Sequence, residues 1–422
     1  MVSTDIEKSF DIAERKYAEF NVNVKDVLKK LSDVSISMHC WQGDDVGGFE
    51  HPNAELSGGG IQVTGNYPGK ARSVQELRQD YLQAFSLIPG NHRINIHAIY
   101  GEFGGKIIDR DNISIEHFQG WIDWARSNDL KIDFNPTLFS HPKASDGFTL
   151  SNKSAEIRDF WIDHVIRCRD IAEGIGRALD DPCINNLWIP DGSKDIPVDR
   201  AGHRNLLMDS LDKIYEKKLN PVYLKDSVEG KLFGVGSESF VVGSHEFYLS
   251  YALSRGLLLT LDCGHFHPTE SVADKISAIL PFNKEILLHV SRGVRWDSDH
   301  VVIVDDNLIS LCEEIVRSGT MGNIHLALDF FDASINRIGA WVIGMRSTLK
   351  GLLYALLQPW DMLLEYEENG QNFQRLALLE ELKTLPYGAI WDHYCLENDV
   401  PVGPSWIQNV EKYEQDVLNS RK

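Results

Sequence analysis

The sequence predicts a (β/α)8 barrel, or TIM barrel, and three observations support this prediction. Eight short apolar runs recur along residues 36–331, as expected for strands that are buried on both faces. Segments with helical periodicity separate the runs, and parallel strands require such crossovers. No G-x-G-x-x-G follows the first run, which disfavours the runner-up, a doubly wound open sheet. Eight strand–helix units are the number that closes one barrel.

The strand candidates are the eight apolar runs, each followed by polar residues. They lie at 36–41, 93–100, 130–135, 184–191, 222–229, 257–262, 286–291 and 324–331. The fifth is the weakest candidate, because Lys225 and Asp226 interrupt it.

Helix signals lie between the runs. They are capping-box spacing at Ser73 and Glu76 and apolar periodicity at 155–178 and 200–218. A further helix is expected to begin after Ser244 as its N-cap and to end at Gly256. We expect Asp306 to cap the helix that begins at Asn307.

Three segments are predicted to lie outside the strand–helix repeat. Residues 4–31 have the pattern of one amphipathic helix that leads into a barrel domain spanning residues 1–340. Residues 341–422 are expected to form a helical extension at subunit contacts. The glycine-rich stretch 43–70 is long and without periodicity, and is either a lid over a site or a surface excursion.

Composition and charge limit the possible partners. The chain has 422 residues, 43% hydrophobic and 25% charged, which is typical of a globular protein. The formal net charge of −20 argues against nucleic acid and anionic membranes as partners. No apolar run reaches the roughly 20 residues of a membrane span. Six scattered cysteines and an acidic N-terminus without an apolar core favour a cytoplasmic protein.

Carboxylates and imidazoles gather where the last four strands end. These residues are Glu229, Asp262, His265, His289, Asp297, Asp299 and Asp329. The C-terminal strand ends of a barrel form one face, so the seven side chains should converge there. Their repulsion would be costly without cations, and mixed oxygen and imidazole ligands suit Mn²⁺, Mg²⁺ or Co²⁺ better than a structural zinc. Seven ligands imply two ions; a cluster of protonated carboxylates is the alternative.

Four further residues have two interpretations each. His97 is either a core histidine or part of the site, and Lys231 either stabilises developing negative charge or is solvated. Trp188 is either an apolar wall against a sugar or part of the core. His267 either orders the "HPTE" turn or takes part in the site, and the sequence favours neither.

Long stretches of the chain resemble the L-rhamnose isomerase family. Among them are "SMHCWQGDDVGGFE", "DFNPTLFSHP", "WIPDGSKD", "LDCGHFHPTE", "HVSRGVRWDSDHVV" and "LDFFDASINRIGAWVIG". The resemblance implies a homotetrameric, cytoplasmic aldose–ketose isomerase that converts L-rhamnose to L-rhamnulose, the first step of rhamnose breakdown. It implies Mn²⁺ as cofactor, with Co²⁺, Mg²⁺ or Zn²⁺ as substitutes.

The resemblance also implies residue roles. Glu229, Asp262, His289 and Asp329 match a structural metal site, and His265, Asp297 and Asp299 match a catalytic one. Lys231, Trp188 and His97 match sugar contacts, and Phe49 matches a residue that reaches a neighbouring subunit's pocket. We expect a metal-assisted hydride shift, with Lys231, Asp297, Asp329 and His97 as the catalytic residues. A metal-dependent hydrolase, a sugar-binding protein and an isomerase of another aldose are the alternatives.

Overall fold

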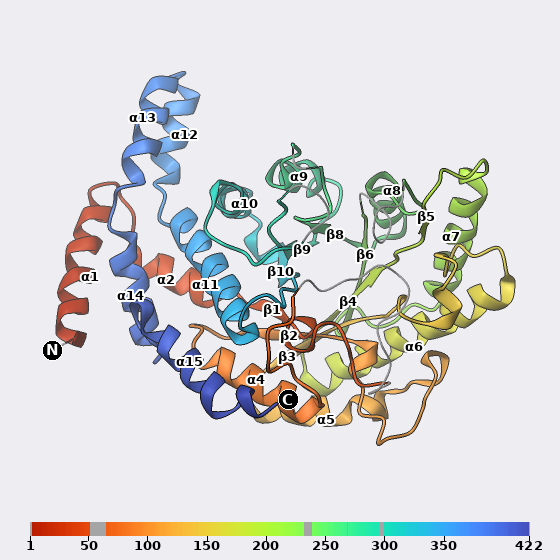
Figure 1. Ribbon diagram of the computed structural model, residues 1–422. Helices are drawn as coiled ribbons and strands as arrows, with labels where there is room; N and C mark the ends of the chain where they lie inside the picture. Colours follow the sequence, from red (N-terminus) through yellow and green to blue (C-terminus); the bar gives the residue numbers. More distant parts are fainter. Residues whose placement is uncertain (1, 51–64, 232–238, 268, 295–298, 422) are drawn as a thin grey trace.

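Eight parallel strands close into a barrel, as predicted from the sequence. The computed structural model describes residues 2–50, 65–231, 239–267, 269–294 and 299–421. Around the barrel the strands follow the order β1-β10-β9-β8-β6-β4-β3-β2 (Figure 1). They are β1 (Ile36–His39), β2 (Arg93–His97), β3 (Lys131–Asn135), β4 (Cys183–Trp188), β6 (Leu224–Glu229), β8 (Leu258–Asp262), β9 (Ile286–Val290) and β10 (Ile324–Leu328).

Among the described residues, two short strands lie outside the barrel, and they were not predicted. β5 (Gly192–Ser193) pairs antiparallel with β7 (Phe240–Val241). A two-residue strand is too short to show the alternation by which strands are recognised in a sequence.

In the part of the chain that the structure describes, eight helices cross over between successive barrel strands or close the barrel after the last one. They are α4 (Val74–Phe85), α5 (Gln119–Ser127), α6 (Ala155–Leu179), α7 (Arg200–Ile214), α8 (His245–Arg255), α9 (Val272–Ile279), α10 (Asp306–Arg317) and α11 (Arg337–Leu356). Trp121, Trp161 and Trp341 lie on three of these helices and are fully buried. Large aromatic side chains therefore contribute much of the apolar surface buried around the barrel.

The remaining helical segments are short or peripheral. They are α1 (Val2–Ala18), α2 (Val24–Ser32), α3 (Trp41–Asp44), α12 (Trp360–Glu368), α13 (Asn372–Leu382), α14 (Tyr387–Glu397), α15 (Trp406–Asp416), and the 3-10 turns η1 (Ala98–Tyr100), η2 (Arg110–Asn112), η3 (Ile115–Phe118), η4 (Pro142–Ala144), η5 (Met321–Asn323), η6 (Gly403–Ser405) and η7 (Leu418–Ser420).

The prediction of a single lead-in helix over 4–31 was wrong. The chain forms two helices, α1 and α2, separated at Asn21, whose φ is +61°. The Asn23 side chain then caps α2 by accepting from the backbone N–H of Lys25 at 3.1 Å. Asparagine tolerates the left-handed conformation and is a strong N-cap, and these two properties outweigh the continuous apolar stripe.

The cap predicted for α10 lies one residue from the observed one. Asp305, not Asp306, is the N-cap: its backbone is extended and its carboxylate accepts from the Leu308 N–H at 2.9 Å. Asp306 is the first helical residue. Gly256 ends α8 with a φ of +68°, as predicted.

The C-terminal helices serve different parts of the molecule. α11 contacts β1, α4 and α10, so it completes the barrel, and the expected boundary between residues 340 and 341 falls within it. α14 packs against α1, with the rings of Phe10 and His393 stacked at 3.8 Å. α12 and α13 pack on each other and project from the body at the upper left of Figure 1. None of the helices in the described ranges is long and apolar enough to cross a membrane.

Candidate metal centre

Four side chains converge at the C-terminal mouth of the barrel because of strand register. Glu229 and Asp262 are the last residues of β6 and β8, and His289 is the penultimate residue of β9. The β8–β9 register places Asp262 directly beside His289, and Asp329 follows the last residue of β10. Parallel strands bring their C-terminal ends to one face, so four residues separated by up to a hundred positions meet there.

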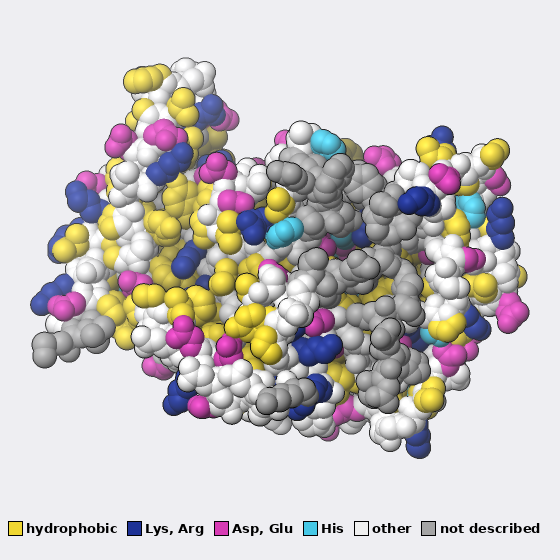
Figure 2. All heavy atoms as spheres, viewed as in Figure 1, with side chains coloured by type: hydrophobic (Ala, Val, Ile, Leu, Met, Phe, Trp, Pro, Cys, Tyr) yellow, Lys and Arg dark blue, Asp and Glu magenta, His cyan; other side chains and the backbone are white. Residues whose placement is uncertain are grey.

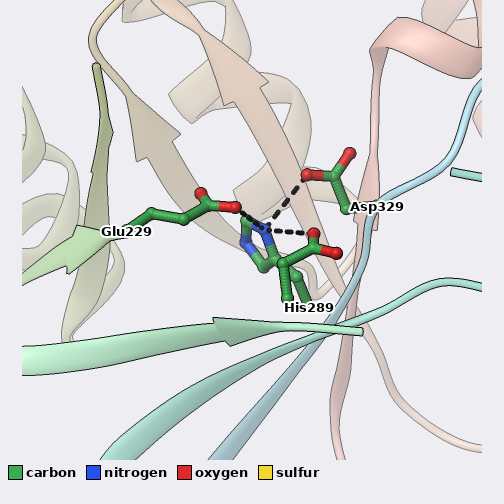
Figure 3. A group of neighbouring side chains, drawn as sticks. Glu229, His289 and Asp329 are labelled. Atoms are coloured by element: carbon green, nitrogen blue, oxygen red, sulfur yellow. Dashed lines mark ion pairs between the residues drawn. The ribbon is translucent and has the colours of Figure 1, made fainter. Parts of the chain in front are cut away.

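The four residues have their ligand atoms close together. One ligand atom from each of Glu229, Asp262, His289 and Asp329 lies within 4.8 Å of all the others. The Nδ1 atom of His289 is 3.1 Å from Asp329 Oδ2, and 3.5 Å from both Glu229 Oε1 and Asp262 Oδ2. Figure 3 shows the Glu229 and Asp329 carboxylates turned toward the His289 ring.

Protein donors bind the outer oxygen of each carboxylate. Asn186 Nδ2 donates to Glu229 Oε2 at 2.6 Å, and the Thr260 hydroxyl fixes that amide by donating to its oxygen at 2.7 Å. Asp262 Oδ1 accepts from the Gly264 N–H at 2.6 Å and from Ser291 Oγ at 3.1 Å. The second oxygen of each group is therefore turned inward.

Asp329 is oriented in the same way from β1. The indole Nε1 of Trp41, on α3 just past that strand, donates to Asp329 Oδ1 at 2.9 Å. The same indole ring packs edge-on against His97 at 4.9 Å between ring centroids. Trp41 therefore connects a candidate metal ligand with a candidate sugar contact.

The inner atoms fit a divalent cation. Glu229 Oε1, Asp262 Oδ2 and both ring nitrogens of His289 are buried and make no hydrogen bond with the described part of the chain. Buried polar atoms are almost always hydrogen-bonded, so this group calls for a ligand. Three carboxylate oxygens and one imidazole nitrogen form a donor set suited to Mn²⁺ and similar ions.

The electrostatics show how strongly these groups interact. Burial alone would raise the pKa of Glu229, but His289 and His265 outweigh burial and lower it. Burial alone would lower the pKa of His289, but the surrounding carboxylates raise it well above its ordinary value. Burial raises the pKa of Asp262. The site therefore favours a positive charge at its centre, which a divalent cation supplies.

A second group shares one ligand with the first. Ligand atoms of Asp262, His265 and Asp299 also lie within 4.8 Å of one another, and His265 Nδ1 is 3.0 Å from Glu229 Oε1. A Cβ on Gly264 would lie 2.1 Å from Asp299 Oδ1, so glycine is needed for this approach. The sequence placed Asp262 in the first set alone, whereas the structure places it in both.

Asp297, the remaining predicted ligand, lies outside the described residues. Half of the glycine-rich stretch expected as a lid, residues 51–64, also lies outside them.

The three candidate sugar contacts lie around one aromatic wall. His97, the last residue of β2, is buried, and Thr137 Oγ1 lies 3.1 Å from its Nδ1. Burial, helped by Arg110, lowers the pKa of His97 to about 3, so the ring is neutral at pH 7. Trp188 ends β4, and Lys231 Nζ lies 4.7 Å from its ring centroid. Phe139 contacts both His97 and Trp188 at 5.6 and 5.8 Å.

Two other predicted residues lie apart from the inner group. The half-buried Phe49 packs edge-on against Tyr100 at 5.5 Å, and its N–H donates to Ile99 O at 2.8 Å. His267 is exposed, with its Nδ1 2.7 Å from Thr269 Oγ1. That contact supports the interpretation that His267 orders the turn.

Comparisons with known proteins give the family. A family model described as L-rhamnose isomerase (RhaA) matches residues 4–421. The chain belongs to the L-rhamnose isomerase family.

Individual relatives agree with this assignment. L-rhamnose isomerase of Rhodopirellula baltica is 57% identical, covering 99% of this chain and 97% of the relative. The enzyme of that name from Bacteroides thetaiotaomicron is 56% identical over 99% of both chains. The one from Enterobacter sp. is 53% identical over the full length of both. The chain is therefore an aldose–ketose isomerase of the L-rhamnose isomerase family, and the hydrolase and pure binding-protein alternatives are set aside.

Within this family member, the donors that orient the carboxylates were not predicted from the sequence. Asn186 had a usable signal, because an amide inside an otherwise apolar strand needs a buried partner. Trp41 had none, because nothing in "MHCWQ" shows that the indole N–H meets a residue 288 positions away. Asp191, which follows β4, is buried and accepts from the N–H and hydroxyl groups of Thr149 and Ser151.

Proposed function

We propose that the protein converts L-rhamnose to L-rhamnulose by a metal-assisted hydride shift, using Mn²⁺. One observation carries the proposal: in a member of the L-rhamnose isomerase family, ligand atoms of three buried residues and of the partly exposed Asp329 meet within 4.8 Å at the mouth of the barrel. Glu229, Asp262, His289 and Asp329 would hold one ion. His265, Asp297 and Asp299, together with Asp262, would hold a second.

An ion held by these residues would supply Lewis-acid chemistry. It would polarise a carbonyl oxygen and lower the pKa of a neighbouring hydroxyl, which are the two changes that an aldose–ketose interconversion requires. Co²⁺, Mg²⁺ and Zn²⁺ are the expected substitutes, because the same oxygen and imidazole donors accept them.

The chain's own residues would bind the sugar and compensate its charge. Trp188 offers an apolar ring face to the sugar carbons, and the Lys231 ammonium lies over that ring. Negative charge develops on O1 and O2 as hydrogen moves between the carbons, and the ammonium would stabilise it. His97 is neutral, so its imidazole can accept the O1 proton and pass it to the ring oxygen O5 as the C1–O5 bond breaks.

The hydrogen transfer itself has two parts. The hydrogen on C2 moves with its electron pair to C1, so C1 is reduced and C2 becomes the ketone. The proton on O2 passes to O1, and we propose that a water molecule held by Asp329 or Asp297 carries it. The Asp329 side chain keeps 16% of its surface exposed, so solvent can reach it.

Assembly and location belong to the same proposal. We infer a cytoplasmic homotetramer in which the C-terminal extension contributes subunit contacts. Exposed apolar side chains on the projecting α12–α13 pair support such contacts, among them Trp360, Phe373 and Leu376. Figure 2 shows hydrophobic side chains on this projection.

A ketose assay tests the activity. Purified protein is incubated with L-rhamnose, L-lyxose or L-mannose, once after chelation and once after Mn²⁺ is restored. We expect L-rhamnulose to form from L-rhamnose, activity to disappear on chelation, and activity to return with Mn²⁺. If ketose formed only from another aldose, that aldose would replace L-rhamnose as the proposed substrate. Full activity in metal-free protein would refute the metal dependence.

The same assay in D₂O tests the route of the hydrogen. A direct shift keeps the original hydrogen, so we expect almost no deuterium at C1 of the product. Substantial deuterium there would show an enediol intermediate that exchanges with solvent.

A further inference from the structure

Arg110, in η2 after β2, lies buried beside the aromatic wall and is outside the residues assigned above. Its side chain is 2% exposed. One side of its guanidinium faces the Glu50 carboxylate: Nε donates to both oxygens at 3.2 Å, and Nη2 donates to Oε1 at 2.5 Å. Glu50 is 9% exposed, so this is a buried, multiply hydrogen-bonded ion pair.

The other side of the guanidinium binds backbone carbonyls of the segment after β3. Nη1 donates to Thr137 O at 2.9 Å and to Phe139 O at 2.6 Å, and Nη2 donates to Ser140 O at 3.2 Å. With the carboxylate, these acceptors match all five N–H groups of an arginine. Ser140 has a φ of +53°, a left-handed conformation that costs about 1 kcal/mol or more and needs such support.

The segment that Arg110 holds carries the wall of the candidate sugar pocket. Thr137 Oγ1 contacts His97 Nδ1, and the Phe139 ring packs on both His97 and Trp188. His164 reinforces the connection, since its Nε2 accepts from the Thr137 N–H at 3.0 Å and its Nδ1 lies 3.0 Å from Arg110 O.

Glu50 connects the same guanidinium to the segment after β1. It follows Phe49, whose N–H donates to Ile99 O and whose ring packs on Tyr100. One cation therefore joins the Phe49–Glu50 segment to the Thr137–Ser140 segment.

We propose that Arg110 is a positioning residue for sugar binding: held by Glu50, it fixes the Thr137–Ser140 segment, whose side chains border His97 and Trp188. This inference rests on the proposed function, because His97 and Trp188 are sugar contacts only if the protein binds an aldose. A lysine cannot replace Arg110. Its three N–H donors all lie on one nitrogen, so they cannot reach both the Glu50 carboxylate and the backbone carbonyls after β3. Displacing this wall should weaken sugar binding more than it slows the chemical step.

The test compares Arg110→Lys with a matched control, Arg169→Lys. Arg169 on α6 is also buried, pairs with Asp226 at 2.9 Å, and donates to Ile214 O and Lys217 O. It has the same kind of partners, but Asp226 lies within β6, away from the strand's C-terminal end. For L-rhamnose with Mn²⁺, we expect Arg110→Lys to raise KM at least about tenfold while kcat changes less than about threefold. Arg169→Lys should lower the thermal midpoint while KM stays unchanged.

Backbone hydrogen exchange gives a readout that does not depend on activity. Peptides covering 137–141 and 47–50 should exchange faster in Arg110→Lys than in the wild type or in Arg169→Lys. If Arg110→Lys does not fold, Glu50→Gln takes its place, because it keeps an acceptor oxygen. It should give a smaller increase in KM and a smaller increase in exchange rate.

The outcomes separate the two proposals. A wild-type protein that makes no ketose refutes the proposed function, and the exchange data then still decide whether Arg110 holds the two segments. An unchanged KM in a folded Arg110→Lys or Glu50→Gln variant overturns the positioning role, as does unchanged exchange at 137–141. Equal KM increases in Arg110→Lys and Arg169→Lys would also overturn it, since any loss of stability would then explain the effect.

Discussion

At the scale of single residues, the carboxylates of the site use their two oxygens differently. The outer oxygen of Glu229, Asp262 and Asp329 accepts a hydrogen bond from Asn186, Gly264 or Trp41, and the inner oxygen faces His289. Fixing one oxygen restricts the rotation of the whole group, so the inner oxygens are preorganised for a cation. The orienting donors are therefore as much a part of the proposed site as the ligands.

Trp41→Phe tests this at one carboxylate. The substitution removes the indole N–H that Asp329 accepts and keeps an aromatic ring at the position. We expect Mn²⁺ to bind about ten- to a hundredfold more weakly, the usual effect of losing a hydrogen bond to a metal ligand. Calorimetric titration of metal-free protein with Mn²⁺ measures this directly.

Trp121→Phe is the matched control for that titration. Trp121 is also buried, but its indole N–H donates to the backbone carbonyl of Tyr100 at 2.8 Å instead of a carboxylate. It should lose comparable stability and keep the wild-type affinity for Mn²⁺. Equal affinities in the two variants would show that orientation of Asp329 does not matter for the metal.

Residue-scale prediction from the sequence named side chains that converge in the structure and missed the donors that orient them. A carboxylate that ends an apolar strand is unusual wherever it occurs, so Glu229 and Asp262 stand out without a structure. The Trp41–Asp329 and Arg110–Glu50 contacts are different, because each joins side chains that are separately ordinary. Their significance comes from tertiary proximity, which a single sequence does not give.

At the scale of secondary-structure elements, short-range hydrogen bonds decide where helices begin. The α10 start shows this, because two adjacent aspartates, Asp305 and Asp306, both suit the N-cap position by residue type. The extended backbone of Asp305 lets its carboxylate accept from the Leu308 N–H. The sequence gives residue type but not backbone conformation, so the prediction was one residue late.

Asp305→Ala and Asp306→Ala form a pair that tests the assignment. Loss of the cap at Asp305 should lower the free energy of unfolding by about 1 kcal/mol. Loss of Asp306 should cost only about 0.3 kcal/mol, because its negative charge near the helix N-terminus contributes weakly. Equilibrium urea unfolding of both variants measures the difference, and an equal or reversed order would place the cap at Asp306.

Element prediction followed the same division between pattern and local conformation. The eight barrel strands were predictable because each is a short apolar run, and the long helix α6 was predictable because apolar residues recur along it at helical spacing. The break between α1 and α2 was missed because an amphipathic stripe continues through Asn21. The β5–β7 pair was missed because it has no periodicity to detect.

At the scale of the whole molecule, barrel closure is what makes the site. β6, β8, β9 and β10 are neighbours around the barrel, so residues at the ends of four crossover units meet at its mouth. Closure also brings β1 beside β10, which places Trp41 against Asp329. The order of strands was predictable from the repeating strand–helix pattern, whereas the projecting α12–α13 pair has no counterpart in that pattern.

The central claim is that the side chains ending these four strands hold a divalent cation. Diffraction from crystals grown with Mn²⁺, recorded at the manganese absorption edge, tests it most directly. We expect an anomalous peak between Glu229, Asp262, His289 and Asp329, with the inner carboxylate oxygens and His289 Nδ1 as ligands. The absence of a peak there, with these four side chains pointing to separate places, would contradict the claim.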